Sequence, residues 1–107
     1  MDDNRLVIKG IYGITKTIDE LITIDTVSIL PSIKSIEDGV SLLGISKGKF
    51  NLKDGQKAEM FVFKNGPPFI YIEYKRANKL YLNFRDVRQT KEFYRQLKVQ
   101  KAKGVMP

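Results

Sequence analysis

Short segments in which apolar residues alternate with other residues, separated by turn-forming pairs, constrain this chain more than any other feature. The clearest case is residues 67–84, PPFIYIEYKRANKLYLNF, where two prolines precede alternating segments at 69–75 and 79–84. A period of two residues is typical of β-strands, and Pro68 at a strand start removes a main-chain donor where its loss costs least. The segment therefore predicts a β-hairpin.

The two faces of this hairpin differ in an unexpected way. One face carries the apolar residues that we expect inside the fold. The other face carries aromatic residues where solvent-exposed strands usually carry charge, so we expect these to lie outside the core or near a rim. The inward set is Ile70, Ile72 and Tyr74 with Leu80, Leu82 and Phe84, and the outward set is Phe69, Tyr71 and Tyr81.

Alternating segments recur along the chain and predict a mainly β protein. Asp54-Gly55 favours a tight hairpin. Pro31 ends the expected strand at residues 22–30, because proline cannot donate to a β-ladder. Residues 17–21 are expected to form one helical turn capped by Thr17, and residues 32–48 are the least regular stretch. The seven expected strands are residues 5–9, 11–17, 22–30, 49–52, 57–64, 69–75 and 79–84, the first two paired as a hairpin with bends at Gly10 and Gly13.

The last element is predicted to be a helix over residues 86–98. Asp86 followed by Gln89 resembles a capping box, although Thr90 is a rival start. An apolar arc predicted to pack on the sheet contains Val87, Thr90, Phe93, Tyr94 and Leu97, and the adjacent basic arc contains Arg88, Lys91, Arg95 and Lys98.

These elements predict the fold class. Seven short antiparallel strands in a chain of 107 residues cannot leave both faces bare. We expect a seven-stranded, partly open barrel or sandwich of two antiparallel sheets, with the helix capping one open end. The chain is expected to be a single domain over residues 1–107, with its core at residues 5–100 and a frayed tail at residues 101–107.

Composition limits where and how the protein works. The chain has no cysteine, which is compatible with a reducing compartment. No apolar run approaches the roughly 20 residues of a membrane span, and the opening MDDNR has no apolar signal region. We expect a cytoplasmic location, with the inner face of the membrane as an alternative.

Charge is distributed unevenly along the chain. Residues 1–46 hold seven acidic and four basic residues, whereas residues 47–107 hold five acidic and fifteen basic residues. Such an imbalance points to an anionic partner for the second half, which could be nucleic acid, an acidic protein or anionic lipid. The alternative is a solvated basic surface that aids solubility.

Catalysis is not expected. The chain has neither histidine nor cysteine, so the commonest acid–base, nucleophilic and zinc-binding groups are missing. The adjacent carboxylates Asp19-Glu20 and Glu37-Asp38 are insufficient for a metal site, and the spacing of Gly39 and Gly44 lacks the lysine of a phosphate-binding loop. We expect no enzyme activity, no cofactor, no metal and no small-molecule substrate.

One set of turn and core residues comprises Ser41, Gly44, Gly48 and Phe50; the strand KAEMFVF; the Pro-Pro-Phe turn into Ile-x-Ile; Tyr-x-Asn-Phe at 81–84; and Phe-Tyr-x-x-Leu at 93–97. In this order the set resembles the bacterial pleckstrin-homology-like families. The resemblance covers residues 6–99 and implies a small β-fold closed by a helix, acting as a binding module. Members are often attached to membrane helices. The first loop KGIYG carries Lys9 alone and the chain lacks tryptophan, so inositol-phosphate recognition is not implied.

Two classes of function follow from these observations. The first is a non-catalytic module that binds a protein partner, itself or an anionic membrane surface, for instance by adding a strand to a free sheet edge. The alternative is a basic nucleic-acid-binding domain in which Phe69, Tyr71 and Tyr81 stack on bases beside Lys75, Arg76 and Lys79. The candidate binding residues are Arg88, Lys91, Arg95 and Lys98 on the helix and Gly44, Lys47 and Lys49 in or beside the glycine-containing stretch.

Overall fold

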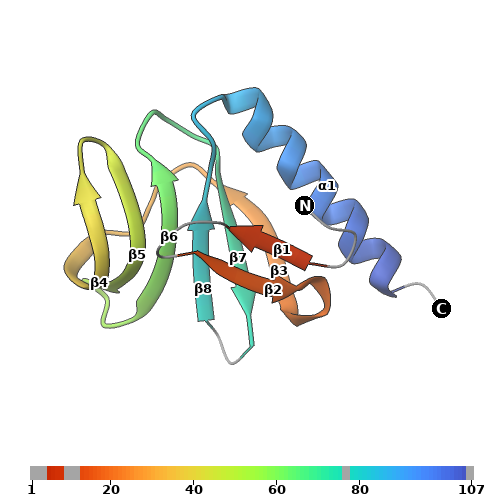
Figure 1. Cartoon of the computed structure of the whole chain (residues 1–107), viewed down its shortest axis with the longest axis horizontal. Helices are drawn as coiled ribbons and strands as arrows, with labels where there is room; N and C mark the ends of the chain where they lie inside the picture. Colours follow the sequence, from red (N-terminus) through yellow and green to blue (C-terminus); the bar gives the residue numbers. More distant parts are fainter. Residues whose placement is uncertain (1–4, 9–12, 76–77, 106–107) are drawn as a thin grey trace.

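A computed structural model describes residues 5–8, 13–75 and 78–105. The predicted bend at Gly10, the Lys9 loop, Arg76 and the last two residues of the predicted tail therefore lie outside the described residues. The chain forms a mainly β structure with a C-terminal helix (Figure 1). The elements are β1 (Arg5–Ile8), β2 (Ile14–Thr17), η1 (Ile18–Glu20), β3 (Leu21–Val27), β4 (Ile33–Leu42), β5 (Ile45–Leu52), β6 (Lys57–Phe63), β7 (Phe69–Tyr74), β8 (Asn78–Leu82) and α1 (Val87–Val105).

The strands form two sheets. β1 and β2 pair as the predicted N-terminal hairpin, and the other six strands form one sheet in the order β3-β7-β8-β6-β5-β4. The prediction of two antiparallel sheets is wrong at one pair, because β8 returns between β7 and β6 and runs parallel to β6. The prediction of seven strands is also wrong, because the described residues form eight.

The alternation in β7 leads to two hydrophobic clusters, one on each side of the six-stranded sheet. The predicted inward residues are confirmed: Ile70, Ile72 and Tyr74 are buried in the first cluster with Leu80 and Leu82. The predicted exposure of the aromatic face is wrong. Phe69 and Tyr81 are buried in the second cluster with Phe50, Leu52, Ala58, Met60 and Val62, and Tyr71 packs half-buried against it.

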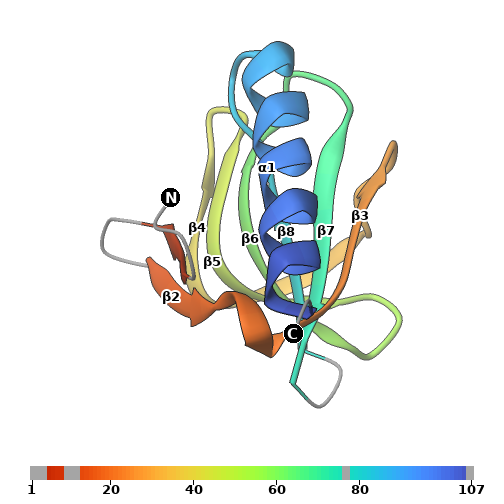
Figure 2. The same cartoon turned by 90° about the vertical axis from the view of Figure 1, so that its right-hand side faces the viewer.

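Helix α1 covers the first cluster by lying along the sheet. Leu97 is fully buried there, and Phe93 and Tyr94 pack against the same cluster. Figure 2 shows the helix running beside the strands across one face, so the prediction that it plugs an open end is wrong. The hairpin β1–β2 and η1 cover more of this face through Leu6 and Ile18.

Curvature of the sheet encloses the second cluster. The opposite edge strands β3 and β4 are joined by residues 28–32 alone, so the sheet must curl to bring its two edges within reach of this short link. Leu30 and Ile33, from the link and the start of β4, pack against the second cluster. The two edges do not pair with each other, so the sheet remains an open, curled layer instead of a closed barrel.

The stretch expected to be irregular is a β-hairpin. β4 and β5 pair from Ile33↔Leu52 to Leu42↔Ile45, with irregularities in the first half of β4. Gly39 faces Gly48 across the pair, and a Cβ on either glycine would lie 2.2 Å from a carbonyl oxygen of the opposite strand. These two glycines therefore permit a close approach of two strands and do not form a loop.

The helix termini show which local predictions hold. The Asp86 carboxylate accepts the Arg88 N–H at 2.8 Å, which confirms Asp86 as the cap, and buried Thr90 exchanges hydrogen bonds with the main chain of Phe84. At the other end α1 continues to Val105, beyond the predicted end at residue 98. Lys101 Nζ donates to the Ile18 carbonyl at 3.5 Å, so contacts with η1 support the additional turns. Residues 18–20 form the predicted turn, without a Thr17 side-chain cap.

Candidate functional site

The seven predicted binding residues fall in two separate places. Gly44 lies in the tight turn between β4 and β5, and Lys47 and Lys49 are exposed on β5. The four basic residues of the predicted helix arc are all exposed on α1. Three of the predicted residues border three different hollows of the surface. Lys49 lines a hollow beside β6, Arg88 lines one beside Phe84, and Lys98 lines one beside Ile22. The structure does not bring the seven together into one site.

Half of the basic arc on α1 is engaged within the protein. Arg95 forms an ion pair with Glu92, with 2.6 Å between Nη2 and Oε1, and Lys98 Nζ donates to the Ile24 carbonyl at 3.4 Å. The Glu92 carboxylate raises the pKa of Arg95 further, so this guanidinium stays charged but paired. Arg88 and Lys91, nearer the start of the helix, have no such side-chain partner among the described residues.

Strand β4 is an edge of the sheet along its full ten residues. It pairs with β5 on one side, and among the described strands no other strand pairs with it. Apolar side chains that would normally be covered are exposed along it, namely Ile36, Val40 and Leu42. Natural proteins usually protect such an edge with charge, proline or bulges, because its free main-chain groups can pair with another chain.

The register identifies which main-chain groups of β4 are free. The two-residue turn Leu43-Gly44 makes Leu42 and Ile45 a hydrogen-bonded pair, and such pairs alternate along an antiparallel ladder. Val40 therefore bonds to β5, whereas Gly39 and Ser41 direct their N–H and C=O groups toward the free side. The two irregularities lie before Asp38, so residues 38–42 form the regular part of the edge.

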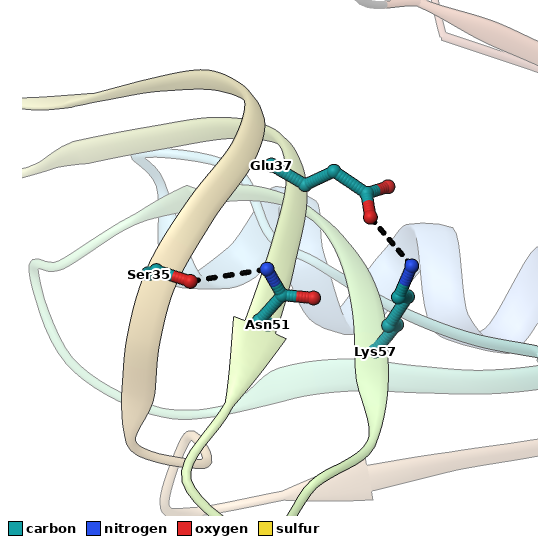
Figure 3. Close-up of polar contacts among 4 residues, drawn as sticks. All are labelled: Ser35, Glu37, Asn51 and Lys57. Atoms are coloured by element: carbon teal, nitrogen blue, oxygen red, sulfur yellow. Dashed lines mark hydrogen bonds and ion pairs between the residues drawn. The ribbon is translucent and has the colours of Figure 1, made fainter.

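Polar side chains fasten the first half of β4, where the ladder is irregular. Figure 3 shows Asn51 donating to the Ser35 hydroxyl at 3.0 Å and Lys57, from β6, pairing with Glu37 at 2.5 Å between Nζ and Oε1. The hydrogen bond and charge of Lys57 lower the pKa of Glu37 below its usual value. The pair is exposed, so it orients β4 more than it stabilises the fold.

The turn after β4 has an unusual residue. Leu43 adopts a positive φ of 52° and the residue is 90% exposed, and the preceding Leu42 is 69% exposed. A left-handed conformation costs an L-residue about 1–2 kcal/mol, and Asn, Asp or Gly normally occupy this turn position. Sequence analysis missed this tip, although the string Leu42-Leu43-Gly44 is a detectable signal: two large apolar residues directly before a turn glycine.

Among the residues that the structure describes, no three acidic side chains gather as a metal site would require. The phenol of Tyr74 donates to the Glu59 carboxylate, and Lys16 lies 4.6 Å from the Tyr74 ring, so these groups satisfy one another. Within the described residues no helix is both long enough and apolar enough to cross a bilayer.

Burial of the aromatic face removes the stacking surface that was expected to bind nucleic acid. Bases stack on exposed rings, whereas Phe69 and Tyr81 are buried and Tyr71 lies against Tyr81 with 5.1 Å between ring centroids. Burial, followed by the nearby charge of Glu73, raises the pKa of Tyr71 to about 12. Burial also raises the pKa of Tyr81 and, together with Glu59, that of Tyr74.

These tyrosines predict how stability changes in alkali. Because their folded pKa values lie above the unfolded value of about 10, the unfolded chain loses protons first as the pH rises. The free energy of unfolding is therefore expected to be unaffected by these groups below pH 10 and to fall as the pH rises from about 10 to 12. Denaturant melts across this range, with an ultraviolet titration of the phenols, provide the measurement. Release of all phenolic protons near pH 10 with no loss of stability would contradict the buried placement.

Comparison with protein-family models, with curated proteins and with solved structures finds no match for this chain.

Proposed function

We propose that this chain is a non-catalytic interaction module that binds an extended segment of a partner protein along the β4 edge. The observation that carries the proposal is the free edge itself: ten residues long, bordered by exposed Ile36, Val40 and Leu42, with a regular stretch at residues 38–42. Strand addition gains affinity from main-chain hydrogen bonds and specificity from alternate side chains. It needs no histidine or cysteine, and the chain has neither. The resemblance to pleckstrin-homology-like domains remains a prediction that agrees with such a role.

Charge favours a different protein over a second copy of this chain. If two β4 strands paired antiparallel over their full length, Glu37 of one copy would lie opposite Asp38 of the other. Like charges directly opposite each other destabilise a strand pair. We therefore expect the purified protein to be a monomer in light scattering, and a concentration-dependent dimer would favour self-association along this edge.

Ser41 allows a sharp test of the edge. Ser41→Pro removes a main-chain N–H that faces the free side, while a proline at such an edge position leaves the bonds to β5 intact. Ser41→Ala is the matched control, because both variants lose the 2.9 Å hydrogen bond between Ser41 Oγ and Ser46 Oγ and only the proline removes the amide.

The measurement uses peptides selected from a random library on the full chain. We expect extended peptides with alternating apolar residues, bound about tenfold more weakly by Ser41→Pro than by Ser41→Ala, since one bond and its neighbours are lost. Hydrogen exchange should slow at the amides of Gly39 and Ser41 when peptide binds. Peptides that bind both variants equally, or a library that yields no strand-forming peptide, would contradict the proposal.

A further inference from the structure

Three turns gather at one end of the molecule, at the top of Figure 1. They are residues 42–45, 63–69 and 83–86, and hydrogen bonds join them. The Lys64 N–H donates to the Gly44 carbonyl at 2.8 Å, and the Asn65 side chain donates to the Arg85 carbonyl at 2.5 Å. We call this end, with residues 87–91 of α1, the rim.

The rim is basic. Its only acidic residue is Asp86, whose carboxylate is occupied by capping the Arg88 N–H, against Lys64, Arg85, Arg88 and Lys91. All four cationic residues are exposed. Lys47, exposed on β5 close to the turn, adds a further positive charge. This arrangement is complementary to a surface of negative charge.

The rim also carries the most exposed leucines of the described chain. Leu42 and Leu43 project at the tip of the β4–β5 hairpin, where the turn would accommodate Asn or Gly with less strain. A large apolar residue kept in a conformation that disfavours it, and in full contact with water, points to a role outside the fold. Strand addition at the β4 edge does not explain why Leu43 is exposed, because Leu43 lies beyond the last paired residue of β4.

We propose that the rim docks on a membrane surface rich in anionic lipid. Leu42 and Leu43 enter the boundary between headgroups and acyl chains, and the surrounding lysines and arginines face the lipid phosphates. A protein partner would need an apolar hollow that is bordered by acidic residues and shaped to fit the rim. An anionic bilayer offers an apolar interior and a negatively charged surface without a matched shape. The rim shares only Leu42 with the β4 edge, and Leu43 and the cationic residues of the rim lie beyond β4, so this inference does not depend on the proposed strand addition.

Leu43→Asn separates binding from folding. Asparagine tolerates the left-handed conformation, so the melting temperature should stay the same or rise. Sedimentation of the full chain with vesicles of equimolar phosphatidylcholine and phosphatidylglycerol should show binding that Leu43→Asn weakens about tenfold, the loss expected for one leucine kept out of the apolar phase. Binding to vesicles of phosphatidylcholine alone should be far weaker, and high salt should reduce binding to the mixed vesicles.

Matched variants control for hydrophobicity and charge in general. Ile22→Asn removes an exposed apolar side chain from β3 at the opposite end of the sheet and should leave vesicle binding unchanged. Lys64→Glu should weaken binding, whereas Lys103→Glu, with the same charge change in the last turn of α1, should have little effect.

Tryptophan fluorescence provides a direct readout of insertion, because the chain has no tryptophan of its own. Emission from Leu43→Trp should shift to shorter wavelength with the mixed vesicles, and emission from Ile22→Trp should not. Vesicle binding that Leu43→Asn leaves intact, equal binding to uncharged vesicles, or no binding by the unmodified chain would each overturn the proposal. Association between copies through Leu43 in solution, without vesicle binding, would overturn it in favour of a protein interface.

Discussion

Ile72→Asp is expected to abolish cooperative folding. Ile72 is fully buried in the centre of β7, where it belongs to the same cluster as Leu21, Leu80 and Leu97. An unpaired buried charge costs about 3–5 kcal/mol and loss of the isoleucine about 2 kcal/mol more. That total is comparable with the roughly 5–15 kcal/mol that stabilises a domain.

Circular dichroism and denaturant melts of Ile72→Asp provide the measurement. Ile22→Asp introduces the same group at an exposed position of the adjacent β3 strand and should fold, and Ile72→Val should cost only about 1 kcal/mol. A sharp unfolding transition for Ile72→Asp close to that of the unmodified chain would mean that this face of β7 does not line the first cluster.

Gly48→Ala is expected to be the most damaging glycine-to-alanine substitution among the glycines at positions 39, 44, 48, 55 and 66. Gly48 has a φ of +120°, and a Cβ there would lie 2.2 Å from the Asp38 carbonyl oxygen and 2.6 Å from Gly39 Cα. Both obstacles are main-chain atoms, which cannot turn aside as a flexible side chain can. We expect a loss of about 3 kcal/mol or more, because backbone strain and steric overlap act together.

Substitutions at two other glycines separate the effect of backbone strain from the effect of steric overlap. Gly44→Ala keeps a positive φ of +75° but meets no atom within 4 Å, so it should cost only about 1 kcal/mol. Gly39→Ala meets the Lys47 carbonyl oxygen at 2.2 Å without a positive φ and should fall between the other two. Urea midpoints of the three variants test this order. Equal effects at all three positions would show that β4 and β5 are not in such close contact.

The β5–β6 and β7–β8 hairpins were predictable from sequence because their signals are local. The Asp54-Gly55 turn predicts the pair β5–β6, and alternation at 69–75 and 79–84 predicts the pair β7–β8. Both pairs are found. Asp86 likewise predicts the start of α1. Such features depend on neighbouring residues only, so no knowledge of the rest of the fold is needed.

Predicting the strand order and the exposed surface would have required knowledge of contacts between residues far apart in the sequence, which a single sequence does not reveal. Alternation places Phe69 and Tyr81 on one face but cannot tell that Phe50 and Met60 on β5 and β6 curl over it. The exposed apolar side chains of β4 likewise obscured its alternation, so the strand resembled a loop. Arg88, Lys91 and Lys47 were among the predicted binding residues, whereas Lys64 and Arg85 were not. The free β4 edge depends on the strand order, and the exposure of Leu43 depends on its backbone conformation.

The placement of β3 next to β7 affects how the protein reaches its native state. Their partners, from Leu21↔Tyr74 to Val27↔Phe69, lie far apart in the chain, whereas β4, β5 and β6 form consecutive hairpins. Closing long loops is slow, so we expect the β4–β6 meander to organise in the transition state and β3 to dock afterwards. Destabilising substitutions in β5 should then slow refolding, and those in β3 should mainly accelerate unfolding in stopped-flow measurements; the reverse pattern would contradict this order. Until β3 docks, β7 would be an unprotected outer strand, so we expect aggregation to begin from partly folded chains that lack β3 more readily than from the native protein.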